Sequence, residues 1–138
     1  TGHARQGSTR SPQWTGGGVV FAPTPRDYSF KMNKKEKAGA LKSALTTKVN
    51  EEKFFVMDSL KFDEIKTKKM VGVLDALKVN KALVVLDGED NDNVEVSARN
   101  IAGVRTVYSN AINVYDILKY DTIIITKSAV AKIEEVYA

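Results

Sequence analysis

The sequence has no cysteine and a single histidine, His3. Without cysteine the chain can form no disulfide, no thiolate-ligated zinc or iron–sulfur site and no thiol nucleophile. One histidine cannot build a multi-histidine metal site, so we expect neither a metal nor another cofactor. No apolar run approaches the roughly 18 residues of a membrane helix, and no signal peptide is visible. These absences favour a small intracellular domain with no membrane partner.

The apolar content is nevertheless that of a folded protein. The 138 residues suit one domain, and 43% hydrophobic with 28% charged residues exclude wholesale disorder. Residues 1–30 differ, because they hold all three prolines and five of the nine glycines, with few apolar residues before Val19. Such a segment buries too little apolar surface to become ordered by itself. We therefore predict an extended basic arm at 1–30 and a globular domain at 31–138.

Positive charge is concentrated near the start of the chain. The whole chain carries +4, but residues 1–48 contain nine Lys or Arg and only two acids, Asp27 and Glu36, which gives +7. The other 90 residues, with 12 bases and 15 acids, sum to −3. A basic arm on an acidic body predicts a polyanionic partner. A membrane surface is the weaker interpretation, because residues 1–18 lack the apolar face of an interfacial helix.

Residues 31–138 alternate between helical and strand patterns. Short apolar runs predict strands at 54–57, 82–86, 104–108 and 122–126, whereas helical periodicity predicts helices that start near 33, 67, 93, 113 and 128. The segment 93–100 fits either structure, and we favour a helix. Because helices join the strands, we predict an α/β fold with a mostly parallel sheet of about four strands covered by helices.

The expected helices have recognisable caps and buried faces. Asn33, Thr67, Asn113 and Ser128 are the expected N-caps, and Glu36 completes a capping box with Asn33. The expected buried residues, helix by helix, are Leu41, Leu45 and Val49; Met70, Val71, Leu74 and Leu77; Val114, Ile117 and Leu118; and Val130, Ile133 and Tyr137.

Catalytic motifs are scarce. The run Gly16-Gly17-Gly18 lacks the preceding strand and the following Lys-Ser/Thr of a phosphate loop, so a flexible or close-approach segment is favoured. The acidic run 87–93 does not follow the order of a calcium loop, and we interpret it as a turn that leads into a helix. The remaining enzyme hypothesis places a site at the carboxyl ends of the strands, near Asp58, Asp87 and Tyr108.

Basic, amide and aromatic residues interleave through the arm in a pattern typical of RNA-binding segments. Arg and Lys neutralise phosphates, rings and guanidinium groups stack on unpaired bases, and glycine lets the backbone approach a phosphate chain. Because the arm has no helical pattern, irregular folded RNA is a better partner than the major groove of a duplex. For Tyr28 and Phe30, which adjoin the domain, anchoring of the arm on the domain is an equal alternative. The candidate RNA-binding residues are Gly2, His3, Arg5, Gln6, Arg10, Gln13, Trp14, Gly16, Gly17, Gly18, Arg26, Tyr28, Lys31, Lys34, Lys35 and Lys42.

Several co-linear blocks resemble one family. The blocks are TGHARQGS (1–8), SPQW (11–14), GGGVVF (16–21), PRDYS (25–29), NKK (33–35), ALKSAL (40–45), KTK (66–68), ARN (98–100), NVYD (113–116), KYD (119–121) and KIEEV (132–136). Together they span the whole chain and are similar to the bacterial L-four family, the fourth protein of the large ribosomal subunit. The sequence departs from this family at His3 and Thr15, where Arg is common, and around Glu36 and Ala38, where the family has more basic residues, so fewer phosphate contacts are expected.

The resemblance implies a structural, rRNA-binding protein of the cytoplasmic ribosome, with no catalytic site and no small-molecule substrate. In this family a long loop threads through large-subunit rRNA toward the peptide exit tunnel, beside the L-twenty-two family protein. Members usually carry a further segment before this point, so we expect a fragment that starts near the loop tip. An RNA-binding regulator that uses the same arm outside the ribosome stays an open alternative.

Overall fold

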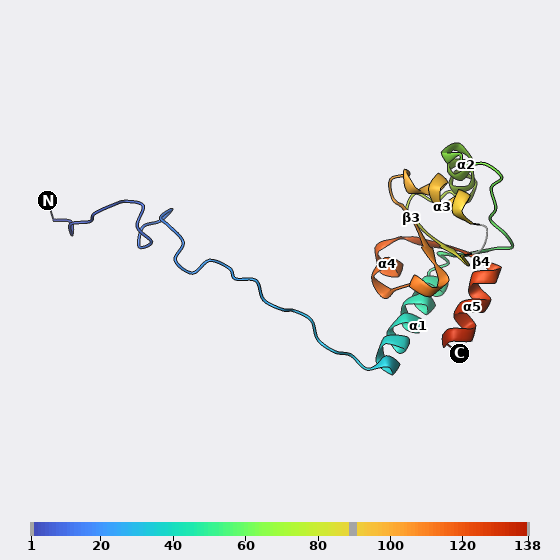
Figure 1. Cartoon of the computed structure of the whole chain (residues 1–138), viewed down its shortest axis with the longest axis horizontal. Helices are drawn as coiled ribbons and strands as arrows, with labels where there is room; N and C mark the ends of the chain where they lie inside the picture. The colour runs from blue at the N-terminus through green and yellow to red at the C-terminus, as the bar shows by residue number, and fades with distance from the viewer. Residues whose placement is uncertain (1, 89–90, 138) are drawn as a thin grey trace. The chain divides into compact units, whose positions relative to one another are not determined.

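The computed structural model describes residues 2–88 and 91–137. The chain divides into two compact units, Thr1–Lys31 and Met32–Ala138, and each is described by itself. Residues 2–31 contain turns and bends but no helix or strand. The second unit (Figure 1) contains α1 (Lys34–Asn50), β1 (Phe54–Met57), α2 (Thr67–Leu77), β2 (Ala82–Leu86), α3 (Asp92–Arg99), β3 (Val104–Tyr108), the short 3-10 helix η1 (Ser109–Ala111), α4 (Val114–Lys119), β4 (Thr122–Thr126) and α5 (Lys127–Tyr137).

The four strands form one parallel sheet in the order β1-β4-β2-β3. In the register, Leu83 of β2 lies opposite Ile123 of β4 on one side and Arg105 of β3 on the other. Parallel neighbours need a crossover connection, and the helices between the strands provide it. The predicted α/β class with a parallel sheet of four strands is therefore confirmed.

Helices cover both faces of the sheet, so two apolar cores form. In Figure 1, α2 and α3 lie on one face, and α1, α4 and α5 lie on the other. Successive residues of a strand point to opposite faces. Leu83 and Val85 accordingly enter the core with α1, α4 and α5, whereas Val84 and Leu86 enter the core with α2 and α3. β2 and β4 are buried at every position, which explains the apolar sequence of β2 and the three isoleucines between the two threonines of β4.

Helix α1 begins with the expected capping box but does not bury the expected stripe. The Asn33 N–H donates to the Glu36 carboxylate at 3.1 Å, which satisfies a free donor at the helix start. Farther along, Leu41 is buried as expected, but Val49 is 54% exposed and Lys48 is only 7% exposed. The Lys48 ammonium donates to the carbonyl of Asp121 at 3.2 Å. A lysine can take a buried position when its stem packs and its charged end finds an acceptor.

Three other details of the helices differ from expectation. Thr67 is the first residue of α2 rather than its N-cap, because the preceding Lys66 is extended and its N–H donates to Ser97 Oγ at 3.0 Å. Ser128 lies inside α5, which follows β4 without a loop. Val71 and Leu118 are exposed, because each helix packs through a narrow stripe and these residues lie about 100° around from it.

The segment 93–100 is helical, as favoured, since α3 covers Asp92–Arg99. Glu89 and Asp90 of the acidic run before it lie outside the described residues.

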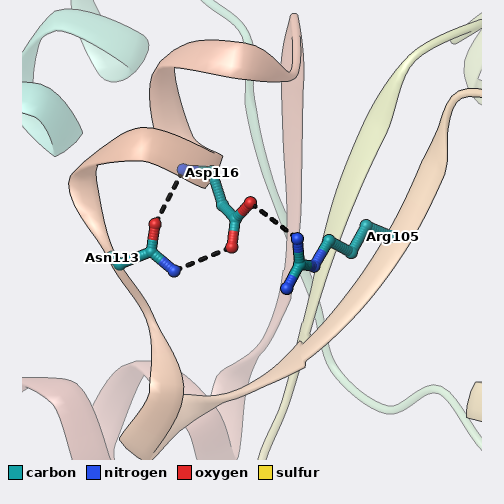
Figure 2. Close-up of polar contacts among 3 residues, drawn as sticks. All are labelled: Arg105, Asn113 and Asp116. Carbon is teal, nitrogen blue, oxygen red and sulfur yellow. Dashed lines mark hydrogen bonds and ion pairs between the residues drawn. The ribbon is translucent and has the colours of Figure 1, made fainter. Parts of the chain in front are cut away.

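A buried carboxylate joins α4 to β3 (Figure 2). Asp116 is 1% exposed, and its oxygens accept hydrogen bonds from Arg105 Nη1 at 3.1 Å and from Asn113 Nδ2 at 2.7 Å. The Asp116 N–H donates to Asn113 Oδ1 at 2.8 Å, so Asn113 is the N-cap that the sequence predicts. Buried charges need such partners. Because Arg105 belongs to β3, the ion pair holds α4 beside this edge strand.

Candidate nucleic-acid interface

The candidate residues from Arg10 to Gly18 lie in a closed turn, which we call the 8–18 turn (residues 8–18). The turn is closed by a hydrogen bond from the Gly18 N–H to the carbonyl of Arg10 at 2.9 Å. Inside it, the Trp14 N–H donates to the carbonyl of Ser11 at 3.0 Å, and the Gly17 N–H donates to the carbonyl of Trp14 at 2.9 Å. The backbone of this part of the arm is therefore folded on itself by local hydrogen bonds.

Two glycines make the 8–18 turn possible. A Cβ atom at Gly17 would lie 2.0 Å from the carbonyl oxygen of Ser11. At this distance no side chain fits at position 17 unless the backbone shifts. Gly16 has φ +81°, in the left-handed region that glycine adopts at no steric cost. The sequence predicts a flexible or close-approach segment here, and Gly17 is at a close approach.

The side chains of the 8–18 turn are available to a partner. Trp14 is 43% exposed, and Arg10 and Gln13 are exposed. The Gln13 side-chain amide donates to the side-chain oxygen of Gln6, so Gln6 is drawn to the turn. Cation, amide and indole groups are thereby brought together within one short segment, a combination that suits phosphate and unpaired bases.

A second local cluster lies at the end of the first unit. The Arg26 guanidinium lies 4.5 Å from the centre of the Tyr28 ring, and Arg26 Nε donates to the Tyr28 hydroxyl at 2.6 Å. The Ser29 N–H donates to the Asp27 carboxylate at 2.8 Å, and this bond lowers the pKa of Asp27. The contacts between Arg26 and Tyr28 thus hold an exposed aromatic ring and an exposed cation side by side.

The other candidates of the first unit stay apart from these clusters. Gly2, His3, Arg5 and Lys31 are exposed. Within the described residues, the side chains of His3, Arg5 and Lys31 form no hydrogen bond or ion pair. The structure therefore groups part of the predicted arm set and leaves the rest as single exposed residues.

The three candidates of the folded unit lie on α1, in two directions. Lys35 and Lys42 are seven residues apart, so they share one exposed face of the helix. Lys34 borders a hollow of about 620 Å³ together with Lys37, a cation that the sequence analysis did not single out. The spacing of three residues between Lys34 and Lys37 is the signal that predicts their common face. The apolar residues of this hollow are Met32, Ala38, Ala40, Leu41, Ile112, Val114 and Tyr137.

The residues of the enzyme hypothesis do not assemble into one site. Asp87 directly follows β2 and Tyr108 is the last residue of the adjacent strand β3, and both line a hollow of about 380 Å³ with Lys132. Asp58 follows β1, which β4 separates from β2, and it is not part of this lining. A hydrogen bond to the Glu95 carboxylate and partial burial raise the pKa of Tyr108 to about 12. At neutral pH the side chain therefore stays protonated and is poorly suited to act as a general base.

No helix among residues 2–88 and 91–137 is both long enough and apolar enough to cross a membrane.

Comparisons with known proteins agree with one another. A family model described as the ribosomal protein L4/L1 family matches residues 1–136. A protein of Lachnoclostridium phytofermentans named large ribosomal subunit protein uL4 is 73% identical over 138 residues, which are 100% of this chain and 66% of that relative. Relatives of the same name from Agathobacter rectalis and Alkaliphilus oremlandii are 70% and 59% identical over all 138 residues and are covered to 66% and 67%. The chain thus spans about two thirds of the length of the curated relatives it matches.

Proposed function

Because this chain belongs to the ribosomal protein L4/L1 family, we propose that it serves as a structural component of the large ribosomal subunit and binds large-subunit rRNA. The family is structural and non-enzymatic, and the hypothesis of a small α/β enzyme is withdrawn. The observation that carries the RNA-binding role is the charge of the first unit, where Arg5, Arg10 and Arg26 occur without one acid in residues 1–26. Such a segment attracts phosphates and contains nothing that repels them.

The proposed contacts are divided between the two units. Residues 1–30 form the rRNA-binding arm, in which arginine side chains neutralise phosphates while Trp14 and Tyr28 offer faces to bases. In the folded unit, Lys35 and Lys42 add a basic face on α1, and Lys34 adds a positive charge beside the apolar hollow.

The finer placement rests on the resemblance of residues 1–29 to the arm of the family. In this proposal the arm threads through rRNA toward the peptide exit tunnel, where the L-twenty-two family protein is its neighbour. The protein then acts in the cytoplasm, within the ribosome. A role as a free RNA-binding regulator would use the same basic surface.

The test is co-sedimentation of the chain with large ribosomal subunits through a high-salt cushion. The full chain should be retained, and a version without residues 1–30 should be lost or weakened. A full-length variant with Arg5, Arg10 and Arg26 changed to Gln keeps the length of the arm and separates charge from bulk. Retention of all three proteins to the same degree would contradict an RNA-binding role of the arm. If the full chain stays at the top but binds a free RNA hairpin, the regulator hypothesis replaces the ribosomal one.

A further inference from the structure

We infer that the 8–18 turn is a preformed platform on which the indole of Trp14 stacks an unpaired RNA base, and that Gly17 is the positioning residue for this ring. The inference rests on the proposed RNA-binding function and adds to it a specific site and the chemical class that the site takes. The observations that carry it are the closure of the turn, the partial burial of Trp14 and the close approach at Gly17.

The 8–18 turn is held by bonds within its own backbone. Gly18 is tied to Arg10, Trp14 to Ser11, and Gly17 to Trp14, with N–H to oxygen distances of 2.9 to 3.0 Å. The Arg10 N–H also donates to Ser8 Oγ at 3.1 Å. Because every partner belongs to the same short segment, local hydrogen bonds can close this turn before RNA binds, in contrast to the arm as a whole, whose composition predicts no order without a partner. An ordered turn meets RNA with less entropy left to lose than a flexible chain does.

Trp14 differs from the other aromatic residues of the first unit. It is 43% exposed, whereas Phe21, Tyr28 and Phe30 are 95%, 75% and 81% exposed. A ring in a featureless tail would be exposed on both faces and free to rotate. Trp14 is instead partly covered, and the part of its side chain that stays exposed is accessible to a base. Every base has a π face, so this contact recognises unpaired RNA with little regard for sequence.

Arg10 supplies the second half of the site. Its N–H and its carbonyl are both engaged within the turn, while its side chain is exposed. The guanidinium is thus displayed from a fixed backbone position close to Trp14 in the chain. Sites for single-stranded nucleic acids combine these two contacts, because a base stacks on an aromatic ring while a nearby cation binds the phosphate.

Gly17 determines the path of the turn, and the neighbouring glycine provides a matched control. A Cβ atom at Gly17 would meet the Ser11 carbonyl carbon at 2.9 Å in addition to the oxygen at 2.0 Å. A Cβ atom at Gly18 would lie 3.6 Å from the carbonyl oxygen of Arg10, an ordinary contact. Gly17→Ala must therefore open the turn, whereas Gly18→Ala makes the same chemical change and leaves it closed.

The experiment uses the intrinsic fluorescence of the full chain, in which Trp14 is the only tryptophan. The probes are a short single-stranded oligoadenylate and an RNA duplex of equal length. Stacking on a base should quench Trp14 emission with the single strand and much less with the duplex. Trp14→Ala, measured by filter binding, should weaken single-strand binding roughly 5- to 150-fold, because base stacking contributes at that level. Trp14→Phe should recover part of the loss.

The glycine variants test the positioning role. Gly17→Ala should reduce the quenching and lower the affinity for the single strand, while Gly18→Ala should match the wild type in both. Equal losses in the two variants would overturn the role of Gly17. Binding by the wild type without a change in emission would overturn the stacking site and leave the proposed rRNA binding intact.

A measurement without RNA tests the preformed state. In the free chain, the amide protons of Gly17 and Gly18 should show the low temperature coefficients of hydrogen-bonded groups, and the amide of Gly7 should not. Solvent-like coefficients at Gly17 and Gly18 would overturn the platform. If the wild type binds neither RNA probe nor ribosomal subunits, the proposed function and this inference fall together.

Discussion

At the scale of single residues, one hydrogen bond governs the titration of Tyr108. Its hydroxyl donates to Glu95, and this bond, with burial and the negative charges of Glu95 and Asp92, raises the pKa from 10.0 to about 12. The folded state therefore holds this proton more tightly than the unfolded chain does. The resulting stability is fully present below pH 10 and is lost as the pH rises through about 12.

Glu95→Gln should bring the pKa of Tyr108 down toward 10.0, because the variant removes the carboxylate that favours the protonated phenol. The measurement is a spectrophotometric titration of tyrosinate. Among the five tyrosines, Tyr108→Phe identifies the late transition by removing it. An unchanged late transition in Glu95→Gln would show that another group causes the shift.

Asp116 offers a prediction about stability. Asp116→Ala should lower the free energy of unfolding by about 1–3 kcal/mol, because the polar groups of Asn113 and Arg105 lose their acceptor. Urea denaturation measures the change, with the slope of the free energy against urea held constant. Asp58→Ala removes an exposed acid of the same type and should stay within about 0.5 kcal/mol of the wild type. Equal effects of the two variants would contradict the structural role of Asp116.

The cap at Asn113 could be predicted from sequence, but the role of Asp116 could not. Asn113 and Asp116 are three residues apart, and such spacing is a local signal. Arg105 lies eleven residues before Asp116 and on a strand, so the pairing depends on the fold. The same division holds in the arm, where residue types indicate RNA contact but do not reveal that Gly17 approaches Ser11.

At the scale of elements, strands were easier to predict than helix faces. All four strands have the expected bounds. The central strands give the clearest signal, because β2 is a continuous apolar run and β4 is three isoleucines between two β-branched threonines. The face of a helix depends on what packs against it. In α1 the buried stripe passes through Leu41, Ala44 and Lys48 rather than through Val49. Hydropathy favours valine over lysine at a buried position. Here lysine is the buried residue, because its ammonium donates to the Asp121 carbonyl.

Lys48 and Val49 permit a direct test of this reversal. Lys48→Ala should lower the free energy of unfolding by about 2–3 kcal/mol, since it removes a buried stem and a hydrogen bond. Lys48→Met keeps most of the stem and should cost about 1 kcal/mol. Val49→Ala should change the value by no more than about 0.5 kcal/mol, because the side chain is exposed and alanine favours helix. The measurement is urea unfolding. A larger loss of unfolding free energy in Val49→Ala than in Lys48→Ala would show that Val49, as expected from the sequence, faces the core.

At the scale of the whole molecule, the distribution of charge matters more than its total. The net charge of +4 is modest, but residues 1–48 carry +7 and the remainder carries −3. This division can be predicted from the sequence, because the charge of a segment depends only on its residue types. The binding of RNA should therefore depend on where a positive charge is removed.

Two triple variants of equal net charge test that dependence. Arg5, Arg10 and Arg26 changed to Gln, or Lys78, Lys81 and Lys127 changed to Gln, each lower the net charge from +4 to +1. The slope of the logarithm of RNA affinity against the logarithm of salt should fall by about 2–3 in the arginine variant, because each phosphate that is no longer neutralised reduces it by about 0.7–0.9. The lysine variant should keep the wild-type slope, because its three exposed positions lie in the acidic part of the chain. Equal slopes in the two variants would mean that total charge, and not the arm, attracts the RNA.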